Sequence, residues 1–145
     1  MSAADLFIGA WDLVPELSLY AAGSPPEAGR YVVSVTDDGR LELTARWRAV
    51  GATDWQSVTF GGAADGTRQA LPASSDAPPG APDAFALTRV DARTLDSSAW
   101  RGERLVAYAR RVASEDGALL AVVQESVAPN DVRLRNFQVY RRATS

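Results

Sequence analysis

Residues 30–48 decide the fold class, and they read Arg-Tyr-Val-Val-Ser-Val-Thr-Asp-Asp-Gly-Arg-Leu-Glu-Leu-Thr-Ala-Arg-Trp-Arg. Within residues 41–48 the apolar and polar side chains alternate strictly: Leu41, Leu43, Ala45 and Trp47 against Glu42, Thr44, Arg46 and Arg48. A period of two with one polar face is typical of an antiparallel, half-buried strand. The Asp-Gly pair before it predicts a hairpin turn, because such turns require positive φ. The stretch therefore predicts a β-hairpin.

The same kind of segment recurs along the whole chain, which we interpret as one domain spanning residues 1–145. We expect strands at residues 9–13, 30–36, 41–48, 55–60, 67–71, 84–90, 93–99, 103–113, 118–126 and 133–142. Residues 15–18 could form one helical turn, and no stretch keeps a helical period over three turns. Since nearly every connection has hairpin length, the sequence favours an all-β fold. We predict a closed antiparallel up-and-down β-barrel of about ten strands with little helix, and a β-sandwich is the alternative.

Composition indicates an ordinary soluble globule, with 46% apolar and 23% charged residues and a net charge of −3. All fifteen cations are Arg, which favours GC-rich bacterial codon usage over a functional choice. They are interspersed with Asp and Glu, so we expect no nucleic-acid partner. The N-terminus lacks a secretory signal, and no apolar run could span a bilayer. We expect a cytoplasmic protein without a membrane span, and a homodimer stays open.

Histidine, cysteine and lysine are absent, and this limits the chemistry that the chain can perform. Ser-His-Asp, Cys-His and lysine Schiff-base devices are excluded. Zinc normally uses Cys and His, and a haem-binding barrel needs an axial His, whereas the sole Met is Met1. We therefore expect no metal and no cofactor. A barrel of this composition suits a small organic molecule.

Residues 7–13, Phe-Ile-Gly-Ala-Trp-Asp-Leu, resemble the Gly-x-Trp first strand of the calycins, the superfamily of lipocalins and fatty-acid-binding proteins. Residues 15–18, 23–26 and 111–117 are also similar to motifs of a bacterial lipocalin-like family of mostly unassigned function. The resemblance spans most of the chain and implies a barrel that holds a small ligand. It further implies that Trp11 plugs the closed end and packs on Arg141 or Arg142.

The last strand resembles the Arg-x-Tyr motif with which fatty-acid-binding proteins hold a ligand carboxylate. Tyr140 matches the Tyr of that motif, and Gln138 replaces its Arg. A neutral, oxygen-bearing ligand suits Gln, because an amide both donates and accepts hydrogen bonds. The chain also departs from those proteins in lacking their two-helix lid.

The facing of the hairpin at residues 103–126 depends on the length of its turn. A three-residue loop at residues 115–117 places Val112 opposite Leu120. The inward face would then carry Val106, Tyr108, Arg110, Val122 and Gln124. A two-residue turn would instead send Arg111 inward with Ala107 and Ala109. A slip of one residue flips every side chain, so both registers remain open.

Arg110 has two interpretations. Inside an apolar cavity it needs an anion from the protein or the ligand, because Arg cannot lose its charge. On the outer face it would pair with a surface Glu or Asp, as long cations usually do. With the three-residue loop, we nominate these ligand-binding residues: Tyr108, Arg110, Gln124, Gln138, Tyr140, Trp47 and Tyr31.

Three functions fit these observations. The leading hypothesis is binding of a small, mostly apolar organic molecule in a barrel cavity. The alternative is a cofactor-independent cyclase, isomerase or hydrolase in the same cavity, for which Glu125 and Asp12 are the strand carboxylates to consider. A third hypothesis is a partner-binding domain with a filled core. The long loop at residues 72–82 is the candidate gate.

Overall fold

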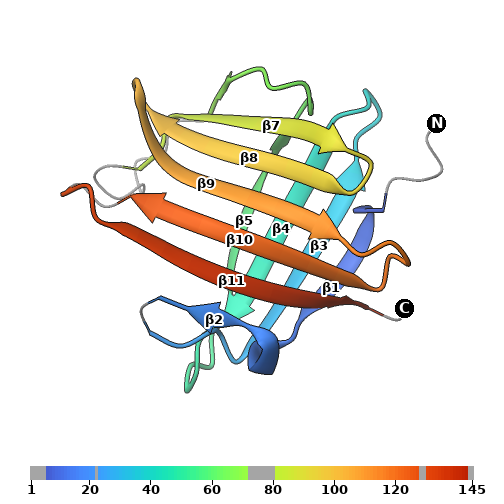
Figure 1. The fold of residues 1–145 in the computed structure, drawn as a ribbon, viewed down its shortest axis with the longest axis vertical. Coiled ribbons are helices and arrows are strands. Elements are labelled where there is room, and N and C mark those ends of the chain that lie inside the picture. The colour runs from blue at the N-terminus through green and yellow to red at the C-terminus, as the bar shows by residue number, and fades with distance from the viewer. Residues whose placement is uncertain (1–5, 22, 72–80, 128–129, 144–145) are drawn as a thin grey trace.

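A computed structural model describes residues 6–21, 23–71, 81–127 and 130–143, and these form one antiparallel sheet wrapped into a barrel (Figure 1). Its strands are β1 (Gly9–Leu13), β2 (Leu19–Tyr20), β3 (Ala28–Val35), β4 (Leu41–Arg48), β5 (Gln56–Gly62), β6 (Gln69–Ala70), β7 (Ala84–Asp91), β8 (Thr94–Arg101), β9 (Arg104–Ala113), β10 (Leu119–Val127) and β11 (Arg133–Arg142). The strand order is β5-β4-β3-β1-β11-β10-β9-β8-β7-β6, and β2 pairs with β11. The predicted all-β, up-and-down barrel is confirmed.

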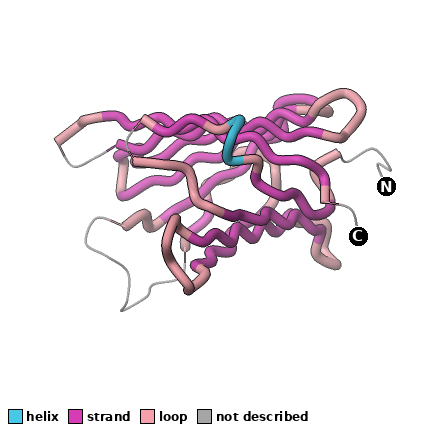
Figure 2. The backbone as a smooth tube through the Cα atoms, turned by 90° about the horizontal axis from the view of Figure 1, so that it is seen from below, coloured by secondary structure: helices cyan, strands magenta, loops and turns pink. Residues whose placement is uncertain are grey.

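The barrel is flattened, and its two walls cross (Figures 1 and 2). Strands β7 to β11 form one wall, and β3 to β5 run behind them at an angle. The two ends of the sheet come together at a seam where β5 approaches β7. There the amide of Gly66 donates to Leu87 O at 2.7 Å, and Phe60 meets Phe85 edge-on with ring centres 5.1 Å apart. The seam leaves the barrel nearly closed.

The predicted elements differ from the observed ones mainly before β3. Residues 15–18 were expected to form a helical turn, and a 3-10 turn spans Pro15–Leu17. The short strand β2 was not predicted, and β3 begins two residues earlier than expected, at Ala28. Most of the candidate gate, residues 72–80, lies outside the described residues. None of the described helical segments has the length and hydropathy needed to cross a membrane.

One end of the barrel is plugged by Trp11, as the resemblance to calycins implied. Its side chain is fully buried, and its indole nitrogen donates to Phe7 O at 3.0 Å. The guanidinium carbon of Arg142 lies 3.9 Å from the Trp11 ring centre. Gly9 has a φ of +127°, and a Cβ there would lie 2.8 Å from Arg142 Nη1, which explains the glycine. We call this region, with Phe7, Trp11 and Arg142 at its centre, the closed end.

Of the two registers left open for the β9–β10 hairpin, the three-residue one used for the nominations is wrong, and the physical reason lies in its loop. Leu120 pairs with Ala113, not with Val112. The loop contains four residues, 115–118, closed by the amide of Ser114 donating to Leu119 O at 2.8 Å. Asp116 stabilises this wider turn by accepting from the Ser114 hydroxyl and the Ala118 amide at 2.7 and 3.0 Å. An even loop sends Arg111 inward and turns Tyr108 and Arg110 outward.

Candidate ligand-binding site

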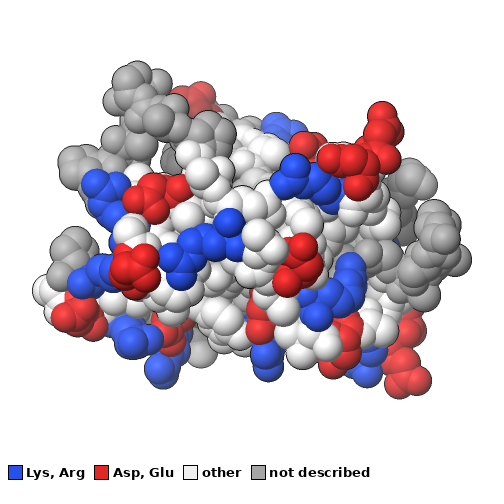
Figure 3. All heavy atoms as spheres, turned by 90° about the horizontal axis from the view of Figure 1, so that it is seen from above, with Lys and Arg blue, Asp and Glu red and all other residues white. Residues whose placement is uncertain are grey.

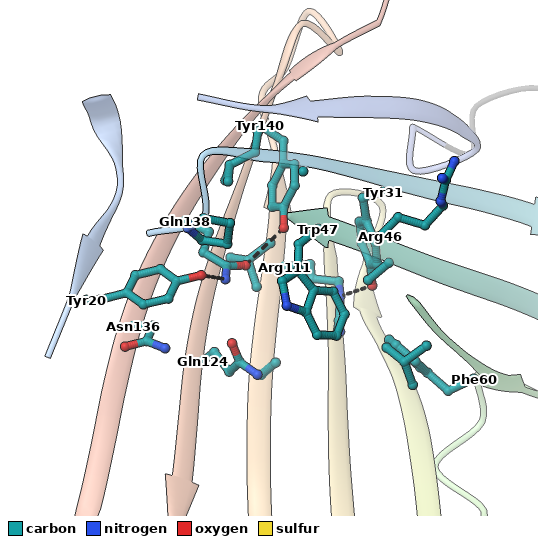
Figure 4. A pocket seen from close by; sticks show the side chains of 17 residues that line it. Tyr20, Tyr31, Arg46, Trp47, Phe60, Arg111, Gln124, Asn136, Gln138 and Tyr140 are labelled. Carbon is teal, nitrogen blue, oxygen red and sulfur yellow. Dashed lines mark hydrogen bonds between the residues drawn. The ribbon is translucent and has the colours of Figure 1, made fainter. Parts of the chain in front are cut away.

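The end of the barrel opposite Trp11 holds an open cavity with a volume of about 320 Å³ (Figure 4). Seventeen described residues line it, and they come from both walls of the barrel. Five of the nominated residues are among them: Tyr31, Trp47, Gln124, Gln138 and Tyr140. We call this region the open end. The barrel is thus filled at one end and hollow at the other, rather than filled throughout.

The pairing of β9, β10 and β11 arranges the inward side chains of this wall in rows. The deepest row contains Ala113, Leu120 and Tyr140. The middle row contains Arg111, Val122 and Gln138. The row nearest the mouth contains Ala109, Gln124 and Asn136, and Tyr20 of β2 continues it. Polarity therefore increases from the closed end toward the mouth, with Arg111 as the deepest charge of the cavity.

Arg111 is only 6% exposed and is held from two sides (Figure 4). Its Nε donates to the Tyr31 hydroxyl at 2.6 Å, and Nη1 donates to the Ser97 hydroxyl at 2.8 Å. Its guanidinium carbon also lies 5.6 Å from the ring centres of Tyr31 and Phe60, within the range of cation–π attraction. These contacts fix the guanidinium plane without neutralising its charge.

No described carboxylate lies within ion-pair distance of Arg111. The charge of Arg111 lowers the pKa of Asp96, but it is the weakest of the effects that do so. Nη2 of Arg111 donates to no described protein group. Among the described residues, the only side-chain nitrogen or oxygen that is both fully buried and without a hydrogen-bond partner is Nε2 of Gln69. Nη2 of Arg111 has no partner among them either, so it must be accessible to solvent. The free amino group of Arg111 therefore faces the cavity.

A second polar group lies along β11. The Tyr140 hydroxyl donates to Gln138 Oε1 at 3.1 Å, and Gln138 Nε2 donates to the Tyr20 hydroxyl (Figure 4). Burial is the main cause that raises the pKa of Tyr20, Tyr31 and Tyr140 above the ordinary value. All three hydroxyls therefore keep their protons at neutral pH and can donate hydrogen bonds.

The electrostatic character of the cavity is set by two cations. Arg111 and Arg46 are the charged residues among the seventeen that line it, and none of the seventeen is Asp or Glu. Arg46 is exposed at the rim, where its guanidinium lies 5.2 Å from the Trp55 ring centre. The indole nitrogen of Trp47 donates to no protein group in the described residues and so adds a further donor. The arrangement favours an acceptor-rich, anionic guest.

Tyr108 and Arg110 do not line the cavity, which corrects the inward facing expected for them. Arg110 donates two hydrogen bonds of 2.8 Å to Asp96 on the outer face, and the Tyr108 hydroxyl donates a third at 2.9 Å. The outward interpretation of Arg110 is therefore correct. Arg111 was expected to face inward only for a two-residue turn, so it was not among the residues nominated on the three-residue register. The Ser-x-Asp-Gly-Ala sequence of residues 114–118 carries the signal for the wider turn.

The two carboxylates considered for catalysis also point outward. Asp12 accepts from Arg30 at 2.9 Å, and Glu125 accepts from Arg133 and Arg135 at 2.5 and 2.8 Å. Acidic and basic side chains are interspersed over the face seen in Figure 3. The described residues contain no group of three or more His, Cys, Asp or Glu placed to hold a metal ion.

Two solved structures resemble the barrel over almost its whole length. The wild-type fluorescent protein UnaG is similar with a TM-score of 0.57 and 18% identity, over 94% of this chain and 97% of that chain. A redesigned β-barrel is similar with a TM-score of 0.56 and 9% identity, over 98% and 96%. No family model and no curated protein matches the sequence. The likeness shows the fold alone, an antiparallel β-barrel like that of UnaG, and it is consistent with the resemblance to calycins seen in the sequence.

Proposed function

We propose that this protein binds a small, mostly apolar molecule with an acidic group in the cavity of the open end, without covalent chemistry. The observation that carries the proposal is Arg111, a buried cation with no carboxylate in ion-pair distance and a free Nη2 facing the cavity. A buried Arg keeps its charge, so the most favourable state of this site includes an anion. A ligand carboxylate can supply it with two parallel hydrogen bonds.

The rest of the cavity supports the same ligand class. Leu13, Val58 and Phe60 provide apolar wall, while the polar groups that remain free are mainly donors. The volume of about 320 Å³ is at the small end of ligand pockets. It equals about ten waters at liquid density, which suits roughly ten to twenty non-hydrogen atoms because bonded atoms pack more closely.

We further propose that binding takes place in a bacterial cytoplasm. The support is compositional: all fifteen cations are Arg and the chain has no Cys, so it needs no oxidising compartment. Whether one or two copies act together is a separate question, and light scattering on the purified protein would measure it directly.

The test compares acids with their uncharged counterparts. Titration calorimetry would measure dissociation constants for decanoic and naphthoic acids and for their methyl esters. We expect the acids to bind more tightly than the esters. The substitution Arg111→Met should weaken acid binding by about 10- to 100-fold, the worth of a charged hydrogen-bonded pair, and leave ester binding nearly unchanged.

The neighbouring outward arginine offers a matched control. Arg110→Met removes the same charge from the same strand, but at a side chain that binds Asp96 on the outer face. Acid binding should survive in this variant. Equal binding of acids and esters, or equal loss of binding in the two variants, would contradict the proposal.

A further inference from the structure

We infer that the ligand carries a second polar group, a neutral oxygen, which binds to Tyr20 and Gln138 while its acidic group binds to Arg111. The inference rests on the proposed function and specifies the class of molecule: a hydroxy or oxo acid rather than a plain apolar acid. It follows from the hydrogen-bond donors left over along β11 and from their position relative to Arg111.

The hydrogen bonds around Gln138 leave two donors without an acceptor. Its amide bridges two hydroxyls, accepting from Tyr140 and donating to Tyr20. An amide has one oxygen and one NH₂, so only one of two bridged hydroxyls can donate to it. Turning the amide over exchanges the roles of the two tyrosines without changing the count. One phenolic proton and one amide proton therefore stay free in a part-buried position, and a ligand oxygen can accept both.

The register places this pair at a fixed distance from the cation. Gln138 and Arg111 both pair with Val122 and so lie in one row on either side of it. Two strand spacings separate their backbones, about 10 Å. Tyr20 lies one row nearer the mouth, across from Asn136. A ligand anchored at Arg111 must pass the apolar Val122 side chain before it reaches Gln138, which defines an acid end, an apolar middle and a polar end.

The second group is neutral because its partners are neutral. Tyr20 and Gln138 carry no charge, and burial raises the pKa of Tyr20 above its ordinary value. Arg46, the other cation that lines the cavity, lies on β4 at the opposite rim, where it interacts with Trp55. A carboxylate at Gln138 would lose its hydration without gaining a counter-charge. A hydroxyl or ketone loses much less and gains the two free donors.

The experiment moves one hydroxyl along a fixed acid. Calorimetry would compare decanoic acid with hydroxydecanoic acids in which the hydroxyl shifts one carbon at a time. We expect one or two positions to bind about two- to tenfold more tightly than decanoic acid, the worth of one neutral hydrogen bond. Tyr20→Phe and Gln138→Leu should each abolish that gain, measured within each variant as the ratio of its affinities for the hydroxy acid and for decanoic acid. Tyr108→Phe, which removes a hydroxyl bound to Asp96 on the outer face, should preserve the gain.

The outcomes separate this inference from the function on which it rests. If decanoic acid binds through Arg111 and no hydroxyl position improves binding, the second subsite is wrong and the proposed function stands. A gain that persists in both Tyr20→Phe and Gln138→Leu would also overturn it. If none of the acids binds, the proposed function fails and the second subsite fails with it. Thermal unfolding of each variant identifies any that does not fold, and two independent substitutions keep the test decisive.

Discussion

The two ends of the barrel each contain a buried or half-buried arginine, and the arginines differ in how many donors the protein satisfies. At the closed end Arg142 donates to the carbonyls of Gly117, Ile8 and Leu6 through all three nitrogens, at 3.0, 2.6 and 2.6 Å. At the open end Arg111 donates through two nitrogens and leaves Nη2 free. A cation that donates through all three of its nitrogens holds the chain together, whereas one with a nitrogen that donates to no protein group has capacity for a ligand.

The largest effect we predict separates the tryptophans of the two ends. Trp11→Ala should lower the free energy of unfolding by about 3 to 5 kcal/mol, because it removes a fully buried ring and leaves a cavity. Trp47→Ala should cost less than about 1.5 kcal/mol, since its half-buried ring already borders an open cavity. Denaturation in urea measures both.

Ligand binding sharpens the same comparison. Trp47→Ala should change the affinity for decanoic acid even though it costs little stability, because Trp47 lines the cavity. Comparable destabilisation by the two substitutions would contradict the division into a filled and a hollow end.

The closed end is also the region where sequence and structure agree best. The Gly-x-Trp strand and the alternation in β4 predict local structure directly, because each residue's facing follows from a period of two. Leu41 and Leu43 are buried as expected. The resemblance to calycins also predicted that Trp11 packs on Arg141 or Arg142 of the last strand, and Arg142 is the residue that stacks on it.

The open end could be predicted only in part, because its facing depends on a loop length. The wall residues Tyr31, Trp47, Gln138 and Tyr140 could be nominated from alternation and resemblance. Arg111 could not, since two registers of one hairpin were compatible with the sequence and they exchange Arg110 with Arg111. Short strands such as β2 leave no periodic pattern at all, so the contribution of Tyr20 to the cavity became visible only in the fold.

The next effect in size concerns the two arginines themselves. Arg142→Met should destabilise the protein by about 2 to 4 kcal/mol, because three carbonyls lose a charged donor. Arg111→Met should change the free energy of unfolding by less than about 1 kcal/mol, because removing a buried, unpaired charge offsets the hydrogen bonds lost at Tyr31 and Ser97. Urea denaturation without ligand measures both variants. A loss at Arg111 as large as that at Arg142 would mean that Arg111 is structural.

The smallest effect tests the outer face beside Arg111. The hydrogen bonds from Arg110, followed by the one from Tyr108, hold the pKa of Asp96 below its usual range against the opposing effect of burial. A folded-state pKa below the unfolded value of about 3.9 means that the carboxylate stabilises the fold fully above that pH. The contribution disappears as the pH falls through the lower, folded value. Asp96→Asn should therefore be slightly less stable than the native protein at pH 7.

This difference between Asp96→Asn and the native protein should shrink as the pH falls below about 4, because the carboxyl of the unfolded chain takes up its proton first, and it should be lost once the pH is below the lower, folded pKa. Urea midpoints at a series of pH values measure it, and comparing the two proteins at each pH cancels the titration of carboxyls elsewhere. The affinity for decanoic acid should stay the same, because Asp96 binds Arg110 on the outer face and not Arg111 in the cavity. A stability difference that persists unchanged at low pH would mean that Asp96 acts through packing. A loss of ligand affinity in Asp96→Asn would mean that the outer carboxylate helps to balance the charge of Arg111, and the contrast between the two arginines would then be smaller than their hydrogen bonds indicate.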